Sequence, residues 1–113
     1  MDLLPGTLEL MILEVLRRGS LHGYGIAKLI KLRSEEALRV EEGTLYPALQ
    51  RLLKQGWVAA EWRLTDTKRR ARFYSLTATG KKKLGEELTN YERMIAAIGR
   101  VLKPARGAAR SGE

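Results

Sequence analysis

The residues of this chain with the greatest capacity for chemistry are cations, and they gather in the middle of the sequence. Residues 43–83 hold 10 Lys and Arg against 2 Asp and Glu, so they carry the net charge of +8. The flanking residues 1–42 and 84–113 have nearly balanced charges. Localised positive charge on a folded domain indicates a polyanionic partner, with nucleic acid first among the candidates. A membrane surface is the alternative, but this segment lacks the broad apolar face of an interfacial helix.

Residues suited to catalysis or metal binding are scarce. His22 is the single histidine and there is no cysteine, so we expect no zinc site of the usual ligand types. No nucleophile–base set or carboxylate pair stands out, and a histidine beside Gly23 favours a turn or packing role over a catalytic base. We therefore predict a protein that is not an enzyme and uses no cofactor.

The absence of cysteine fits a reducing cytoplasm. The apolar run 8–16 is interrupted by Glu9 and Glu14 and is too short and polar for a membrane span. At 113 residues, the chain forms one domain large enough to bury a core. We predict a cytoplasmic protein with no membrane partner.

A helix over 43–55 opens the basic segment. An interior helical proline costs about 3 kcal/mol, whereas the first turn has no amide hydrogen bond to lose, so Pro47 predicts a helix start near Gly43 or Thr44. Gly56 is a natural C-terminal stop. At about 100° per residue one face is leucine-rich, and the other carries Tyr46, Pro47, Gln50, Arg51 and Lys54. That outer face is either an ordinary solvated surface or a binding face.

Other elements surround this helix. We expect helices over 8–17, with Thr7 as N-cap, and over roughly 23–33, followed by a linker or brief strand at 37–40. Period-two alternation then predicts strands over 58–63 and 72–76, joined by a turn at 65–70. The predicted two-stranded hairpin must lean on the helices for stability.

A last helix opens at Thr77 or Thr79 and reaches about Leu102. Its apolar residues follow heptad spacing and form a candidate dimer seam, namely Leu84, Leu88, Tyr91, Ile95, Ile98 and Leu102. The seam is long for so small a domain, so a second copy of the chain is the simplest cover. Packing within one chain is the alternative. Residues 103–113 are expected to be a disordered tail.

The order of elements predicts the fold, which is mainly α with a small β-hairpin. The helices at 23–33 and 43–55 suit a helix-turn-helix, and the basic hairpin makes a wing. Residues 1–78 would form this winged helix-turn-helix domain, and 79–102 a long C-terminal dimerisation helix. The second helix of such a pair enters the major groove of DNA with its N-terminal end foremost.

That placement assigns candidate roles to individual residues. The DNA recognition helix would use Thr44, Tyr46, Pro47, Gln50, Arg51 and Lys54, with Gln50 suited to adenine, Thr44 to a thymine methyl, and Arg51 and Lys54 to phosphates. The wing would use Lys68, Arg69, Arg70 and Arg72 along the backbone or in a minor groove. Further phosphate contacts are Tyr24, Lys28 and Lys81.

Three further groups of residues have expected roles other than reading bases. Glu41 and Glu42 would repel phosphates, so we interpret them as capping residues of the helix that follows. Lys81, Lys82 and Lys83 oppose the dipole at a helix N-terminus, and a phosphate contact or a solvated face accounts for them equally well. The side chains of Trp57 and Trp62 are expected to form the hydrophobic body of the wing sheet.

Four segments together resemble the PadR-like transcriptional regulators, a family named for repression of phenolic acid decarboxylase. They are Leu21-His22-Gly23-Tyr24-Gly25-Ile26, Glu42-Gly43-Thr44-Leu45-Tyr46-Pro47-Ala48-Leu49, Gly56-Trp57-Val58, and Arg69-Arg70-Ala71-Arg72-Phe73-Tyr74-Ser75-Leu76-Thr77. They occur in this order over nearly the whole chain. The chain resembles the shorter branch of the family, with a single C-terminal helix.

The resemblance implies a homodimeric winged-helix repressor whose two protomers read an inverted repeat in a promoter. It also implies release by a small aromatic or hydrophobic effector, bound at the dimer interface, for which Tyr91, Trp57 and Met94 are candidate contacts. The principal alternative is a winged-helix protein–protein interaction module that binds an acidic partner without specific DNA binding.

Overall fold

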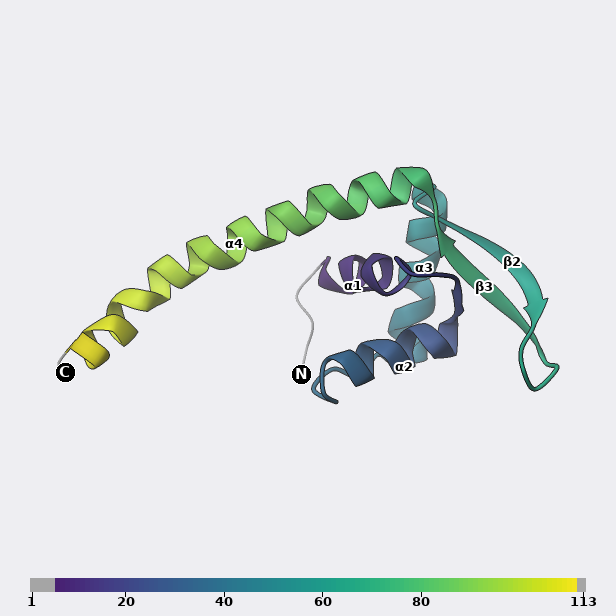
Figure 1. Cartoon of the computed structure of the whole chain (residues 1–113), viewed down its shortest axis with the longest axis horizontal. Coiled ribbons are helices and arrows are strands. Elements are labelled where there is room, and N and C mark those ends of the chain that lie inside the picture. Colours follow the sequence, from purple (N-terminus) through teal and green to yellow (C-terminus); the bar gives the residue numbers. More distant parts are fainter. Residues whose placement is uncertain (1–5, 112–113) are drawn as a thin grey trace.

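The computed structural model describes the backbone of residues 6–111 and the side chains of residues 6–103. Its elements follow in the order α1 (Thr7–Val15), β1 (Leu21–His22), α2 (Gly23–Arg33), α3 (Glu42–Gln55), β2 (Val58–Leu64), β3 (Arg70–Leu76) and α4 (Ala78–Ser111). Helices α1, α2 and α3 form the body, and the β2–β3 hairpin projects from one end. Helix α4 starts at the base of this hairpin, crosses over α1 and extends away on the opposite side as a single long helix (Figure 1). This is a winged helix-turn-helix, as the sequence predicted.

The core lies where the helices meet the base of the hairpin. Its fully buried side chains come from all three body helices, because each presents an apolar stripe at helical spacing; the largest are Ile12, Leu13, Leu16, Ile26, Leu45, Leu49 and Leu52. Val58 and Tyr74 extend the core into the hairpin base. The hairpin is thus anchored at its base.

Helix α3 starts earlier than the sequence predicted. It begins at Glu42, so Pro47 lies inside the helix rather than in its first turn. The proline cannot donate to the carbonyl four residues back, and that carbonyl belongs to exposed Gly43, which solvent can reach. The expected stop is confirmed, since Gly56 forms the C-cap. Tertiary packing of the leucine face therefore outweighs the local cost of the proline.

The sheet has three strands, in the order β1-β3-β2, rather than the two expected from the sequence. Leu21 pairs with Tyr74 and His22 with Phe73, so the two-residue strand β1 joins the outer edge of β3. So short a strand has no alternation by which to recognise it. Its pairing ties the N-terminal end of α2 to the wing.

Other boundaries also differ from expectation. Gly6, not Thr7, is the N-cap of α1, and Thr7 is the first helical residue. The segment 37–40 contains no strand. Glu41 is the N-cap residue of α3, as predicted, although its side chain makes no capping hydrogen bond, and Glu42 lies in the first turn of the helix rather than before it.

Helix α4 is fastened to the wing base by Thr77. The Thr77 hydroxyl donates to the Gly56 carbonyl at 2.7 Å and accepts from the Gly80 amide at 2.9 Å. Gly80 packs so closely that a Cβ built there would lie 1.9 Å from the Trp57 carbonyl oxygen. Of the two threonines considered for the helix start, Thr77 therefore caps it, and Gly80 permits the close approach.

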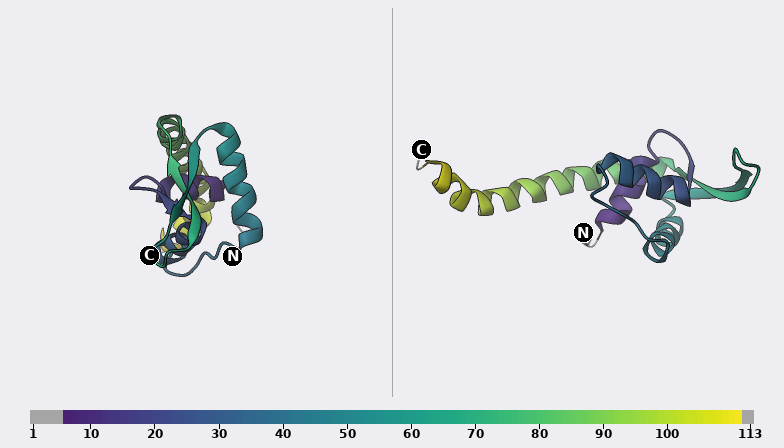
Figure 2. Two further views of the ribbon diagram at one scale, coloured as in Figure 1. Left: turned by 90° about the vertical axis from the view of Figure 1, so that its right-hand side faces the viewer. Right: turned by 90° about the horizontal axis from the view of Figure 1, so that it is seen from below.

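Beyond its first turns, α4 extends away from the body (Figure 2). The helix continues to Ser111 rather than ending near Leu102, so the tail expected at 103–113 is helical as far as Ser111; residues 112 and 113 lie outside the described part. Thr89 donates to the Gly85 carbonyl at 3.1 Å, one turn back. Bonds of this kind often bend helices, and α4 curves gently along its length (Figure 1).

The predicted dimer seam divides into two parts. Leu84 is 3% exposed and Leu88 is half-buried against the core of the same chain. The distal part is exposed, with Ile95 at 48%; its exposed large apolar residues are Tyr91, Met94, Ile95, Ile98, Val101 and Leu102. Intramolecular packing therefore covers only the first part of the seam.

Candidate nucleic-acid interface

A groove of about 970 Å³ lies between the N-terminal half of α2, the outer face of α3 and the hairpin β2–β3. Four of its lining residues are cationic, and the lining comprises His22, Gly23, Tyr24, Lys28, Tyr46, Gln50, Trp62, Thr65, Asp66, Thr67, Arg69, Arg70, Ala71, Arg72 and Tyr74. We call this surface the wing groove. It brings together residues from segments that are far apart in the sequence.

The structure divides the residues predicted for the recognition helix. Tyr46 and Gln50 line the wing groove. Thr44, Pro47 and Lys54 are exposed on α3 but lie outside the groove lining. They are therefore free to reach a partner larger than the groove itself.

Arg51 occupies a different position from the one the sequence indicated. Its Nε lies 2.9 Å from the Glu9 Oε2 on α1, and it is absent from the groove lining. Helical spacing placed Arg51 on the outer face but could not show that α1 supplies an acid there. A phosphate contact by Arg51 would compete with this ion pair.

Tyr46 is held in place by the N-terminal end of α2. A Cβ built on Gly23 would lie 2.6 Å from the Tyr46 hydroxyl, so the phenol rests directly on the glycine. His22 caps the same helix, because its Nδ1 accepts from the Gly25 amide at 2.9 Å. The His22 ring also lies edge-on to Phe73, with centroids 5.2 Å apart. These contacts give His22 the turn and packing role expected from the sequence.

At the tip of the wing, a loop of three residues, 66–68, lies between Thr65 and Arg69, which are joined by a hydrogen bond. The Thr65 amide donates to the Arg69 carbonyl, and the Lys68 amide donates to the Thr65 carbonyl, each at 2.8 Å. Lys68 has a φ of 63°, the left-handed conformation that completes hairpin loops of this length. Lys68 and Arg69 are exposed at this tip, whereas Arg70 and Arg72 belong to β3. The predicted wing cations therefore extend from the tip along the strand.

The groove-facing side of the wing pairs cations with aromatic rings. The Arg70 guanidinium lies 5.1 Å from the centre of the Trp62 ring, and that of Arg72 lies 5.9 Å from the centre of the Tyr74 ring. Burial raises the pKa of Tyr74, although the nearby Arg72 charge opposes this rise. Trp62 is 59% exposed, so its predicted place in the hydrophobic body of the sheet was wrong.

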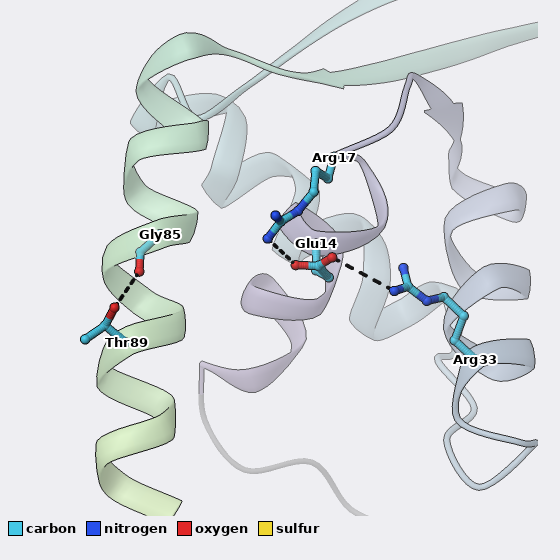
Figure 3. A network of polar contacts seen from close by, with 5 residues as sticks. All are labelled: Glu14, Arg17, Arg33, Gly85 and Thr89. Atoms are coloured by element: carbon cyan, nitrogen blue, oxygen red, sulfur yellow. Dashed lines mark hydrogen bonds and ion pairs between the residues drawn. The ribbon is translucent and has the colours of Figure 1, made fainter.

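Cations elsewhere on the molecule are often neutralised by acids. Glu14 on α1 lies 2.8 Å from Arg17 and 3.9 Å from Arg33 of α2 (Figure 3). Similar pairs join Lys31 to Glu36, Arg63 to Glu61 and Lys83 to Glu87. Within residues 6–103, no acidic side chain lies within ion-pair distance of the four groove cations, Lys28, Arg69, Arg70 and Arg72. These four cations outnumber Asp66, the single acid in the lining, so the wing groove carries a net positive charge.

The additional phosphate contacts predicted from the sequence are also separated by the fold. Tyr24 and Lys28 are exposed and line the groove from α2. Lys81 is exposed on α4 but lies outside the lining, as does Lys82. Lys83 pairs with Glu87 at 3.0 Å and lies over the half-buried Trp57 ring. Lys81 and Lys82 are thus exposed on α4, away from the wing groove.

Sequence reasoning overlooked Trp62, Tyr74 and the loop threonines as groove residues. Alternation in the sequence indicated only that Trp62 shares one face of its strand with Ala60 and Leu64, and the register places Trp62 opposite Arg72. Only the antiparallel pairing shows that this face carries the arginines. No cluster of potential metal ligands occurs among the described residues, and none of their helices is long and apolar enough to span a membrane.

Comparison with known proteins identifies the family. The profile of the transcriptional regulator PadR-like family matches residues 12–86, a range that includes the helix-turn-helix and the wing. The chain belongs to the PadR-like family. The resemblance that its motifs carry is therefore confirmed, and this is a family of transcriptional regulators.

Two relatives have similar sequences over the same length. The negative transcriptional regulator PadR of Bacillus subtilis (strain 168) is 29% identical over 85 residues, which cover 75% of this chain and 47% of that protein. The chain thus spans about half the length of this relative. An uncharacterized protein of Lysinibacillus sphaericus is also 29% identical over 85 residues, covering 78% of its length.

Solved structures agree with the PadR-like assignment. A transcriptional regulator from Clostridium thermocellum aligns with a TM-score of 0.77 and 29% identity, covering 84% of this chain and 89% of that one. Bacillus subtilis PadR, solved in complex with operator DNA, aligns with a TM-score of 0.65 and 30% identity over 73% of this chain and 46% of that one. These structures share the winged-helix fold described above.

Proposed function

We propose that this PadR-like protein is a sequence-specific DNA-binding transcriptional regulator that reads duplex DNA with α3 and its wing. The observation that carries the proposal is the wing groove, where exposed Tyr46 and Gln50 of α3 stand beside four cations that form no ion pair within residues 6–103. Phosphates supply most of the affinity of such interfaces, and base edges supply the specificity. The operator complex of Bacillus subtilis PadR supports this assignment through kinship.

Within this proposal the residues divide between base and phosphate contacts. The N-terminal end of α3 enters the major groove, where Gln50 pairs with adenine and Thr44 meets a thymine methyl. Tyr46 and Pro47 line the approach to the base edges. Lys54 binds phosphate, whereas Arg51 does so only if its ion pair with Glu9 opens.

The wing and α2 supply the remaining phosphate contacts. Arg70 and Arg72 lie along the inner face of the wing, and Lys68 and Arg69 extend from its tip. A narrow minor groove has an enhanced negative potential that suits these arginines. Tyr24 and Lys28 meet the backbone on the other side of the wing groove, and Lys81 is the outermost candidate.

The assembly in this proposal is a homodimer joined through α4. The distal seam residues Tyr91, Ile95, Ile98 and Leu102 are exposed in the single chain, and a stripe of this kind needs a partner helix. A twofold dimer presents two copies of α3, so its operator is an inverted repeat. The division into a DNA-binding domain at 1–78 and a dimerisation helix at 79–102 belongs to this proposal.

Kinship also suggests the direction of regulation. The Bacillus subtilis relative is named a negative transcriptional regulator, so we assign this protein the role of repressor. A small aromatic or hydrophobic effector would release it from DNA by binding beside the dimer seam. Tyr91 and Met94 are exposed there, whereas Trp57 lies half-buried beneath Lys83 and is a less accessible contact.

Selection of bound duplexes from random DNA tests the function directly. Recovery of a common inverted repeat is the expected result, and the selected duplex then serves in the measurements below. Failure to bind any duplex, together with capture of an acidic protein surface, would instead identify a winged-helix protein-interaction module.

Arg70→Ala should weaken binding to operator and unrelated duplexes alike, because a wing cation contacts phosphate rather than base edges. The slope of log K against log salt should flatten by about 0.9 for the single lost contact. Fluorescence anisotropy at several salt concentrations measures both quantities. Arg100→Ala is the matched control, since Arg100 is an exposed cation on distal α4 and should leave the slope unchanged. An unchanged slope for Arg70→Ala would remove Arg70 from the interface.

Gln50→Ala should change specificity more than general affinity. A bidentate pair with adenine contributes about 1–3 kcal/mol of discrimination, so the variant should lose preference at one base pair of each half-site. Binding to a panel of operators with single substitutions checks this. A uniform loss across the whole panel would show that Gln50 does not contact a base edge.

A further inference from the structure

Trp62 is an unusual surface residue. Its ring lies on β2 in the wing groove and is 59% exposed, although burial of a tryptophan ring is strongly favourable. The core of the same chain already holds Val58 and Tyr74 at the hairpin base. The indole therefore adds little to the fold and remains on a charged surface.

The Trp62 ring contacts a cation of the neighbouring strand. The Arg70 guanidinium lies 5.1 Å from the ring centre, within the range of cation–π attraction. In the register of the hairpin, Trp62 stands opposite Arg72 and Leu64 stands opposite Arg70, so the Trp62–Arg70 contact is diagonal. Diagonal neighbours in a sheet are within reach of long and aromatic side chains.

This contact changes what Arg70 can do. A free arginine side chain loses much rotamer entropy when a ligand immobilises it. Arg70 has no acidic partner within ion-pair distance in residues 6–103, and its guanidinium lies over the indole. Stacking leaves all five N–H donors of the guanidinium available for phosphate or base oxygens.

We propose that Trp62 is a positioning residue for DNA binding: its ring holds the Arg70 guanidinium against the inner face of the wing, ready to contact the duplex. This role rests on the proposed function and deepens it. Trp62 acts through Arg70 and carries no charge of its own, which separates it from the wing cations in solution measurements.

Trp62→Ala should lower affinity for the selected operator duplex by about two- to fivefold, the loss expected for one exposed cation–π contact. The log K against log salt slope should stay close to that of the wild type, because the cation remains. Trp62→Phe should recover most of the affinity, since it restores a ring face. A merely structural defect of the wing would instead flatten the slope by several contacts.

Leu64→Ala is the matched control. Leu64 is 65% exposed on the same face of the same strand, so its truncation also removes exposed apolar surface but breaks no contact between a cation and a ring. Its affinity should equal that of the wild type. Denaturation midpoints of the Trp62 and Leu64 variants verify that both wings remain folded.

A double-mutant cycle decides the outcome. In the background of Trp62→Ala, Arg70→Ala should cost less affinity than in the wild type, because the two residues act as one unit. Independent, additive losses would overturn the role of Trp62 while leaving the proposed function intact. Absence of duplex binding by the wild-type protein would overturn both.

Discussion

Gly80→Ala is expected to lower the free energy of unfolding by about 2 kcal/mol. The added Cβ would lie 1.9 Å from the Trp57 carbonyl oxygen and 2.9 Å from a methyl group of Leu76. A backbone carbonyl cannot rotate aside, so α4 must shift from the wing base at a cost of about 3 kcal/mol. The greater helix propensity of alanine returns at most about 1 kcal/mol. Urea denaturation at a fixed protein concentration measures the difference.

Gly85→Ala is the control for this prediction. Gly85 belongs to the same helix, and a Cβ built there meets nothing within 4 Å. This variant should be as stable as the wild type, or more stable by up to about 1 kcal/mol. Equal stability of Gly80→Ala and Gly85→Ala would show that the junction between α4 and the wing tolerates a side chain.

Ile95→Asp is expected to dissociate the proposed dimer into monomers. Ile95 is 48% exposed at the middle of the distal seam, and burying an unpaired carboxylate there would be prohibitively costly. Each monomer would then bind one half-site on its own, without the high effective concentration that a linked second protomer provides. Operator affinity should therefore fall by at least about 100-fold. Light scattering gives the mass, and anisotropy with the selected duplex gives the affinity.

Ala96→Asp introduces the same charge at the next position of α4. At about 100° per residue, Ala96 lies on the opposite side of the helix from the centre of the distal seam, and it is exposed. The variant should remain dimeric and bind the operator normally. The dimer proposal would be contradicted if the wild-type protein had the mass of one chain and neither substitution altered this mass.

Some features of the fold were predicted from local pattern, and others depended on packing. The apolar stripes of α1, α2 and α3 predicted the body because each needed a common core. Pro47 misled the prediction of the start of α3: its cost is real, but the buried leucine face holds the helix together across it. Strand β1 was missed because two residues carry no period, and only pairing with β3 defines them.

The candidate site shows the same division. Charge distribution and element order were sufficient to predict that the wing cations lie near the outer face of α3. Helical spacing alone could not show that Arg51 turns to Glu9 on α1. Nor could alternation in β2 show that Trp62 stays exposed, since the hairpin extends past the helices that would have covered it (Figure 1).

By itself, the sequence determined the winged helix-turn-helix, its basic central segment, the PadR-like motifs and the apolar repeat of α4. These are local properties, written in periodicity, charge and short motifs. Only the tertiary structure decided which cations are neutralised, which aromatic rings face the wing groove, and where along α4 the apolar seam is no longer covered by the core of its own chain. Each of these depends on contacts between residues far apart in the chain, and no local pattern encodes such contacts.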